Sequence, residues 1–230
     1  MSEAAPPSPP RRRGPSPRAN DDAEARRQVV AAYREVGRRG LIAGSSGNVS
    51  HRTPAGMIIT PSGCSAETLD PADLVPMTLA GDVKGNTAPS SEWAMHAAIY
   101  LAYPAAHCVV HTHADACTAL ACLNEALPPF HYMVANFGGN DVRCAPYVTF
   151  GTPELARLAV EALAGRTACL LANHGMIVHA AGADRALSAA VVLEALCRQY
   201  LLARSAGTVR LLSAEEMRAA HDRYRTYGQR

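Results

Sequence analysis

The sequence predicts a single-domain α/β fold built on a mixed or mostly antiparallel sheet. Helix-like and strand-like segments alternate irregularly along the 230 residues, and some strand-like segments follow one another directly, as the strands of hairpins do. No internal repeat is present. A chain of this length with 48% hydrophobic residues is long enough for one domain with a large core.

The first 20 residues differ from the rest of the chain, because they are rich in proline, arginine and serine and offer almost nothing to bury. They also lack the apolar segment that a signal peptide requires. We therefore expect a disordered tail at residues 1–20 and a folded domain at residues 21–230.

The folded part is expected to begin with a helix over residues 20–40. Asparagine and aspartate residues at its start are capping candidates, apolar residues recur at helical spacing, and Gly40 gives a stop. Residues 48–63 then contain two short β-like runs on either side of Pro54, a pattern typical of a hairpin.

A helix followed by a buried strand is expected next. The helix covers residues 90–103, with Ser90 or Ser91 as its N-cap and Pro104 after its end. The strand covers the apolar run at 107–113.

The second half of the chain alternates in the same way. Residues 152–165 show favourable helix punctuation, with Thr152 as cap, Pro153 at the first helical position and Gly165 at the close. The other segments expected there are a short helix at 115–123, an extended run at 144–151, strands at 167–173 and 174–180, and helices at 182–207 and 213–228.

Charge and composition argue against several function classes. The formal net charge is only +2, and no basic stripe interleaved with aromatic residues is present, so no nucleic-acid partner is expected. Charged, histidine or glycine residues interrupt the apolar stretches, so no membrane span is expected. The seven cysteines form no close-set pairs, which favours reduced thiols in a cytoplasmic protein.

Two histidines separated by one residue suggest a metal site. His111 and His113 lie at the end of the 107–113 run, and in an extended chain their side chains point to the same face. His174 stands where another apolar run leads into a glycine-containing turn. Three imidazoles would leave an open position, as in catalytic zinc sites, and nitrogen ligands suit Zn²⁺ better than Mg²⁺ or Ca²⁺.

A carboxylate that could complete this site is Glu92. It falls in the first turn of the 90–103 helix, where the helix dipole favours a negative charge. His96 lies four residues further on the same helix face, so a metal pair of Glu92 and His96 is a competing idea. We rank it lower, because His96 belongs to an apolar face and is expected to pack there.

Three further stretches offer hydroxyl and backbone N–H groups of the kind that hold a phosphate. They are the Gly/Ser/Asn-rich run at 44–50, the turn at 60–63 and the helix start at 88–92. Each signal is weak alone, but three such stretches beside a candidate metal site favour an anionic ligand.

The ordered motifs GNVS, TPSG, PSSEW, VVHTH, HYM, GGN, CAPYVTFG, NHG and TYG resemble the class II sugar-phosphate aldolase family, typified by L-fuculose-1-phosphate aldolase. The resemblance runs from about residue 25 to residue 230. It implies a central, largely antiparallel sheet between helix layers. It also implies a homotetramer with active sites at the subunit interfaces.

The resemblance assigns roles to residues that match the family motifs. His111, His113 and His174 match zinc ligands, and Glu92 matches a carboxylate that binds the resting metal and serves as general acid and base. Tyr132 matches a tyrosine that reaches the neighbouring subunit's site, and Tyr227 matches a tyrosine of the C-terminal tail. The residues that match phosphate contacts are Asn48, Ser62, Gly63, Ser90 and Ser91.

The activity implied is zinc-dependent, reversible cleavage of a deoxy-ketose 1-phosphate to dihydroxyacetone phosphate and an aldehyde. L-Fuculose 1-phosphate and 5-deoxy- or 5-methylthio-ribulose 1-phosphate are the candidate substrates, and Phe150 and Tyr224 would suit their apolar ends. Lys84, the only lysine, lies in a polar turn and is unsuited to Schiff-base chemistry. The alternatives are an epimerase or dehydratase on the same scaffold and, less favoured, a non-catalytic interaction module.

Overall fold

The computed structural model describes residues 17–226, and one seven-stranded sheet lies at its centre. The strand order is β3-β2-β1-β4-β7-β6-β5. All neighbouring strands are antiparallel except β5 and β6, which are parallel, so the expected mostly antiparallel sheet is confirmed. The strands are β1 (Asn48–Thr53), β2 (Gly56–Ile59), β3 (Val75–Met77), β4 (Cys108–Thr112), β5 (Cys144–Ala145), β6 (Ala168–Leu171) and β7 (Gly175–Ala180).

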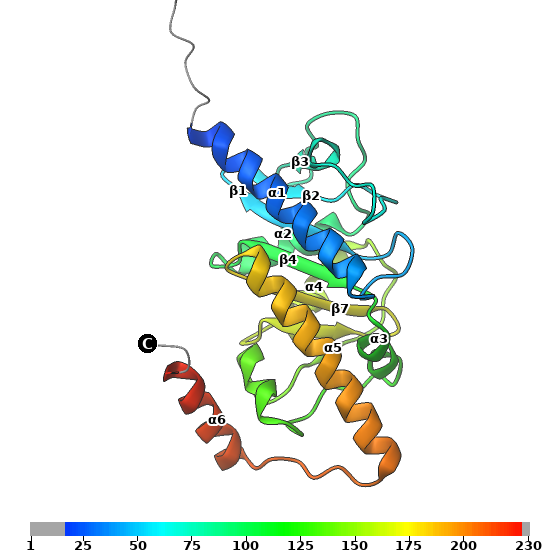
Figure 1. The fold of residues 1–230 in the computed structure, drawn as a ribbon, viewed down its shortest axis with the longest axis vertical. Helices are drawn as coiled ribbons and strands as arrows, with labels where there is room; N and C mark the ends of the chain where they lie inside the picture. The colour runs from blue at the N-terminus through cyan, green and yellow to red at the C-terminus, as the bar shows by residue number, and fades with distance from the viewer. Residues whose placement is uncertain (1–16, 227–230) are drawn as a thin grey trace, which may run out of the picture.

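Helices cover both faces of the sheet and separate two apolar cores. Figure 1 shows α1 and α5 lying across one face, and α2 packs with α4 in the second core on the other side. The short 3-10 helix η2 contacts both α5 and α6. The helices are α1 (Pro17–Arg38), α2 (Trp93–Ala102), α3 (Asp115–Cys122), α4 (Pro153–Ala162), α5 (Ala183–Ala206) and α6 (Ala214–Thr226), with 3-10 helices η1 (Pro71–Asp73) and η2 (Tyr132–Phe137).

The helix α5 is, among the described residues, the one helix long and apolar enough to cross a membrane. Glu194 and Arg198 interrupt its apolar sequence, as expected, and α5 meets the criterion by length and composition only. Its buried side chains, which include Ala186, Ala190 and Leu193, recur at helical spacing and belong to the first core. In this fold α5 packs as a core helix along β4 and β7.

The expected helix punctuation is confirmed at two places. After α1, Gly40 adopts a left-handed φ of 67°, and Leu41 donates its N–H to the carbonyl of Val36 at 3.0 Å, which closes a Schellman motif. Before α4, the hydroxyl of Thr152 accepts the N–H of Leu155 at 3.2 Å, with proline at the first helical position.

Several boundaries differ from the sequence expectation. The helix α1 begins at Pro17, before the expected start at residue 20, and residues 1–16 of the expected tail lie outside the described residues. Of the extended run at 144–151, only Cys144–Ala145 pairs as a strand. The edge strand β3 was not expected, because Pro76 in its centre weakens a strand signal except at a sheet edge.

The seven cysteines are all free, as expected for reduced thiols. Four of them are fully buried in the cores: Cys108, Cys117, Cys169 and Cys197.

The antiparallel register brings three strand ends to one edge of the sheet. Asn48, the first residue of β1, lies opposite His111 near the end of β4, and His111 lies opposite Ile177 near the start of β7. Gly175 allows the close approach of β7 to β4, since a Cβ atom there would lie 2.3 Å from the carbonyl oxygen of Thr112. Segments distant in sequence therefore meet where β4 ends.

Candidate metal centre and substrate cleft

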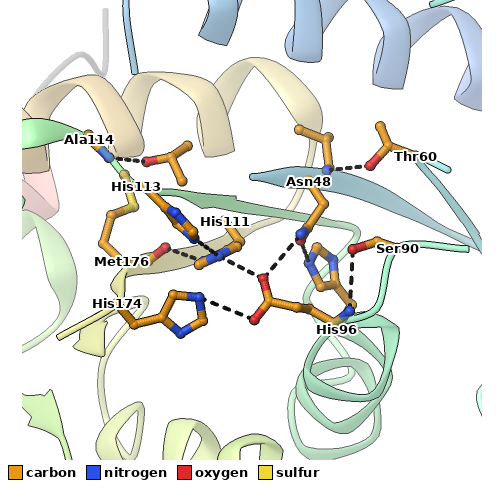
Figure 2. A network of polar contacts seen from close by, with 12 residues as sticks. Asn48, Thr60, Ser90, His96, His111, His113, Ala114, His174 and Met176 are labelled. Carbon is orange, nitrogen blue, oxygen red and sulfur yellow. Dashed lines mark hydrogen bonds and ion pairs between the residues drawn. The ribbon is translucent and has the colours of Figure 1, made fainter. Parts of the chain in front are cut away.

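Three histidine rings converge at this edge of the sheet. His111 belongs to β4 and is fully buried, His113 follows β4 directly, and His174 ends the turn that leads into β7. Their ring centroids lie 4.8 to 4.9 Å apart. Figure 2 shows the three rings turned toward one point, as the spacing of the first two predicted.

Glu92 supplies a carboxylate to the same point, although its place in the helix differs from the expectation. It is the N-cap of α2, with φ −100° and ψ 14°, rather than a first-turn residue capped by Ser90 or Ser91. Its side chain makes no capping bond. Instead, Oε2 lies 2.8 Å from Nε2 of His111, and Oε1 lies 3.3 Å from Nε2 of His174.

A hydrogen bond to the backbone turns one ring nitrogen of His111 toward the centre of this cluster. Its Nδ1–H donates to the carbonyl of Met176 at 2.8 Å, which fixes the ring with Nε2 toward the centre of the cluster. That nitrogen faces both Oε2 of Glu92 and, at 3.0 Å, Nε2 of His113. Potential ligand atoms of three residues therefore meet at one point, an arrangement that suits a cation.

The donor atoms fit a metal ion as a set. One ligand atom from each of Glu92, His111, His113 and His174 lies within 4.8 Å of the others. Oε1 of Glu92 is buried without an aligned hydrogen-bond partner among the described residues, as expected for an atom that a metal would satisfy. Three imidazole nitrogens and one carboxylate form a donor set that suits a catalytic divalent metal.

Burial and charge keep three of these residues in the protonation states that bind a metal. Burial and the neighbouring His111 lower the pKa of His113 and of His174 to about 4 each. Burial alone would raise the pKa of Glu92, but the contacts with His111, His174 and Asn48 hold it well below its usual range. At neutral pH His113 and His174 therefore offer unprotonated nitrogens, and Glu92 offers an ionised carboxylate.

A cleft of about 430 Å³ opens over the cluster. None of the described residues that line it is a lysine or an arginine. Its wall is instead rich in hydroxyl groups and glycines, which suit an anion bound by neutral donors. The lining residues are Ser45, Ser46, Gly47, Asn48, Pro61, Ser62, Gly63, Ser90, Ser91, Glu92, His113, Tyr147, Val148, Phe150, Asn173 and His174.

Two of the three stretches expected to hold an anion are tied directly to each other. Ser62 donates its N–H to the carbonyl of Ala88 at 3.1 Å, and Ser90 donates to the carbonyl of Thr60 at 3.0 Å. A bridge between Pro61 and Pro89 lies between these bonds. The turn at 60–63 is thereby fixed beside the start of α2, and the run at 44–50 completes the wall.

Most of the site residues expected from sequence line this cleft or its floor. Asn48, Ser62, Gly63, Ser90 and Ser91 are all on the wall. Tyr132 lies on η2 away from the cleft of its own chain, is 54% exposed, and stacks on His131 and Tyr224. Tyr227 lies outside the described residues.

The geometry does not favour the competing metal pair of Glu92 and His96. Both ring nitrogens of His96 are engaged by other groups, Nε2 with Asn48 at 2.5 Å and Nδ1 with Ser50 at 2.6 Å. His96 is fully buried, as its apolar helix face predicted, but it is also a member of a polar network.

Sequence reasoning missed several lining residues. Ser45 and Ser46 fall in the flagged 44–50 run without having been singled out, and Asn173 occupies a left-handed turn with φ 53°. Tyr147 and Val148 line the cleft together with Phe150. The sequence indicated only that they belong to the extended run at 144–151, and not that they face a cleft. Phe150 lines the cleft as expected, whereas Tyr224 does not line it.

Comparison with known families agrees with this geometry. The family described as Class II Aldolase and Adducin N-terminal domain matches residues 27–201. The chain belongs to this family. The match spans the sheet, the metal cluster and most of α5, so the resemblance seen in the motifs is confirmed.

Individual members of the class II aldolase family are similar over nearly the whole chain. A 5-methylthioribulose-1-phosphate/5-deoxyribulose-1-phosphate aldolase of Rhodospirillum rubrum is 44% identical over 88% of this chain and 92% of its own. The L-fuculose phosphate aldolase of Escherichia coli is 42% identical over 89% and 95%. A solved L-fuculose 1-phosphate aldolase matches with a TM-score of 0.84 at 36% identity, over 88% of this chain and 96% of that one.

These relatives and the metal cluster separate the chain from a non-catalytic interaction module. The protein is an enzyme of the class II aldolase type.

Proposed function

We propose that the protein catalyses the zinc-dependent, reversible cleavage of a deoxy-ketose 1-phosphate to dihydroxyacetone phosphate and an aldehyde. One observation carries the proposal: a His₃Glu cluster forms the floor of a cleft whose wall is made of hydroxyl- and glycine-rich loops. The cluster suits a carbonyl and its neighbouring hydroxyl, and the loops suit a phosphate at a fixed distance from them.

His111, His113 and His174 would hold the metal, and Glu92 would occupy a fourth position until substrate binds. A divalent zinc ion bound there supplies Lewis acidity, which polarises a carbonyl and stabilises negative charge on its oxygen. The Nδ1–H bond of His111 to Met176 supports this assignment, because it fixes the ring with Nε2 toward the ion.

The phosphate is assigned to Asn48, Ser62, Gly63, Ser90 and Ser91. Their donors are neutral, and the start of α2 lies immediately beside the last two. The positive end of a helix dipole and several hydroxyl groups favour a dianion in this position. Binding the phosphate there would orient the remainder of the substrate across the metal cluster.

Glu92 is assigned the proton at the carbon next to the carbonyl. The carboxylate is ionised, buried and directed toward the centre of the cluster, so it is placed to act as general base and, in the reverse direction, as general acid. Once displaced from the ligand set, it would remain within reach of a substrate held by the three histidines.

We further propose a homotetramer in the cytoplasm, with each site completed by a neighbouring chain. Tyr132 is half-exposed on η2, away from its own cleft, which supports a role in a neighbouring site, where its hydroxyl would exchange a proton with the hydroxyl at the cleaved bond. Tyr227 is assigned to the mouth of the site by the family resemblance. Seven free cysteines support a reducing compartment.

The relatives supply the candidate substrates. The name of the Escherichia coli relative points to L-fuculose phosphate, and that of the Rhodospirillum rubrum relative to 5-methylthio- and 5-deoxyribulose 1-phosphate. Tyr147, Val148 and Phe150 give the cleft an apolar side that suits the deoxy or thioether end of either substrate.

The test is cleavage of a panel of these ketose 1-phosphates by zinc-loaded protein, with both products identified. We expect dihydroxyacetone phosphate and the matching aldehyde from at least one deoxy-ketose. Release of an isomerised or dehydrated phosphate in place of two fragments would contradict the proposal and favour the epimerase or dehydratase alternative.

A further inference from the structure

A line of four buried polar side chains runs from Glu92 into the interior between β1 and α2. Nδ2 of Asn48 donates to Oε2 of Glu92 at 3.3 Å, and the side-chain oxygen Oδ1 of Asn48 lies 2.5 Å from Nε2 of His96. Nδ1 of His96 lies 2.6 Å from the hydroxyl of Ser50, which lies 2.8 Å from that of Tyr100. None of the four is more than 5% exposed, and Figure 2 shows the His96 ring next to the Asn48 amide.

The direction of every bond in this line is fixed by its starting point. A carboxylate only accepts hydrogen bonds, so the amide NH₂ of Asn48 faces Glu92 and the amide oxygen faces His96. Nε2 of His96 must then carry the proton, which leaves Nδ1 to accept from Ser50. The Ser50 oxygen in turn accepts from Tyr100, so the line has a single consistent set of donors.

The surroundings favour these protonation states. Burial and the nearby His111 lower the pKa of His96 to about 3, which keeps the ring neutral with one N–H. Burial also raises the pKa of Tyr100 well above its ordinary value, so its hydroxyl remains a donor.

The two ends of an asparagine amide have the same shape and opposite hydrogen-bonding character. Turned over, the Asn48 side chain would place its oxygen against Oε2 of Glu92, and two acceptors would face each other in a buried site. Among the described residues, His96 is the group that holds the Asn48 oxygen. The correct orientation of the amide therefore depends on a ring that does not line the cleft.

We propose that His96 is a positioning residue, whose Nε2–H locks the Asn48 amide so that its NH₂ group serves Glu92 and the substrate phosphate. This inference rests on the proposed function for its effect on turnover, but the orientation of the amide is a property of the resting protein. Ser50 and Tyr100 support the tautomer of His96 from behind.

The first experiment compares His96→Leu with His96→Gln. Leucine fills the space without a donor, whereas glutamine retains an N–H for the Asn48 oxygen. We expect His96→Leu to lose about 10- to 100-fold in kcat/KM, in the range found for groups that orient catalytic ligands, and His96→Gln to recover most of that loss. Equal losses in the two folded variants would overturn the proposal.

A double-mutant cycle separates positioning from a general structural effect. If His96 acts through Asn48, His96→Leu should change kcat/KM by less than about twofold in an Asn48→Ala background. If His96→Leu instead lowers kcat/KM by the same factor in the Asn48→Ala background as in the wild type, the two residues act independently and the proposal is contradicted. The matched control is His179→Leu, which removes another buried histidine, stacked on Tyr103 and outside the cleft; it should lower the melting temperature without a comparable loss of kcat/KM.

A measurement without substrate keeps this inference distinct from the proposed function. Selective ¹⁵N labelling and NMR of the whole protein should show His96 as the neutral Nε2–H tautomer and slowly exchanging Asn48 NH₂ protons. Those amide protons should exchange faster in His96→Leu. An Nδ1–H tautomer, or unchanged Asn48 exchange in the variant, would refute the positioning role. Failure of wild-type protein to cleave any ketose 1-phosphate would refute only the proposed function.

Discussion

Asn48 and His111 face each other across the β1–β4 pair, and both side chains reach the same oxygen of Glu92. Nδ2 of Asn48 lies 3.3 Å from Oε2, and Nε2 of His111 lies 2.8 Å from it. The register of two strands thus joins the candidate metal cluster, the proposed general base and the proposed phosphate wall. This arrangement makes specific predictions for each part.

Replacement of Glu92 by glutamine should separate metal binding from catalysis. Three histidines remain to hold the ion, and glutamine preserves the shape and the acceptor oxygen, but it cannot take a proton. We expect about one metal ion per chain, an unchanged unfolding transition and a loss of cleavage of at least about 100-fold, typical of a missing general base. Wild-type activity in this variant would remove Glu92 from its assigned role.

Replacement of His113 by alanine should lower the metal content of the purified protein. The ring supplies one of the four converging ligand atoms, and few ligands remain to compensate. Elemental analysis checks this, with His51→Ala as the control, because His51 lies outside the cluster with Nδ1 against the Arg52 carbonyl. Equal metal content in both variants would show that the cluster is not the metal site.

The approach of β7 to β4 predicts that Gly175→Ala is harmful. The new methyl group would meet the Thr112 carbonyl oxygen at 2.3 Å, so the strand end that precedes His113 must move. We expect a loss of about 1–3 kcal/mol in the free energy of unfolding and weaker metal binding.

Denaturant unfolding and metal titration measure both effects of Gly175→Ala. Gly182→Ala is the control, since its Cβ would meet nothing within 4 Å, and it should cost less than about 1 kcal/mol. A Gly175→Ala protein as stable as wild type would mean that the two strands are not packed this closely.

Metal-depleted protein should lose stability as the pH falls from about 6.5 toward 4. The pKa of His113 and of His174 is lowered to about 4 in the folded chain, from an ordinary value of 6.5. Between these values the unfolded chain binds protons that the folded chain does not, so acid favours unfolding. Glu92 acts in the same direction at lower pH, because its pKa is also lowered.

Thermal melts across this pH range check the prediction. Bound metal should raise the melting temperature most at neutral pH, since protons compete for the same nitrogens at low pH. A melting temperature of the metal-free protein that does not fall between pH 6.5 and 4 would contradict the assigned environments of the two histidines.

The sequence predicted the metal cluster because its signals are local. His111 and His113 share a face by strand geometry alone, and glycine or proline marks the turns around His174 and Glu92. The sheet class and most helices follow from periodicity in the same way. Short strands such as β5, with two residues, carry no such pattern, and their pairing depends on the completed sheet.

The roles of His96 and Asn48 as a pair could not be predicted from spacing. They lie 48 residues apart and meet only because β1 pairs with β4 while α2 packs beneath. The position of Glu92 outside the helix has a similar cause, since its carboxylate contacts histidines from β4 and from the turn before β7 instead of capping its own helix. In both cases contacts between distant segments, and not the local sequence pattern, determine the partner of the side chain.

The most direct test of the central claim is a titration of zinc into chelator-treated protein, with cleavage of a deoxy-ketose 1-phosphate followed at each addition. The account predicts no cleavage without metal, a rate that rises in proportion to added zinc, and a plateau at one ion per chain. Undiminished cleavage by the metal-free protein would contradict it, as would full metal binding with no cleavage of any ketose 1-phosphate in the panel.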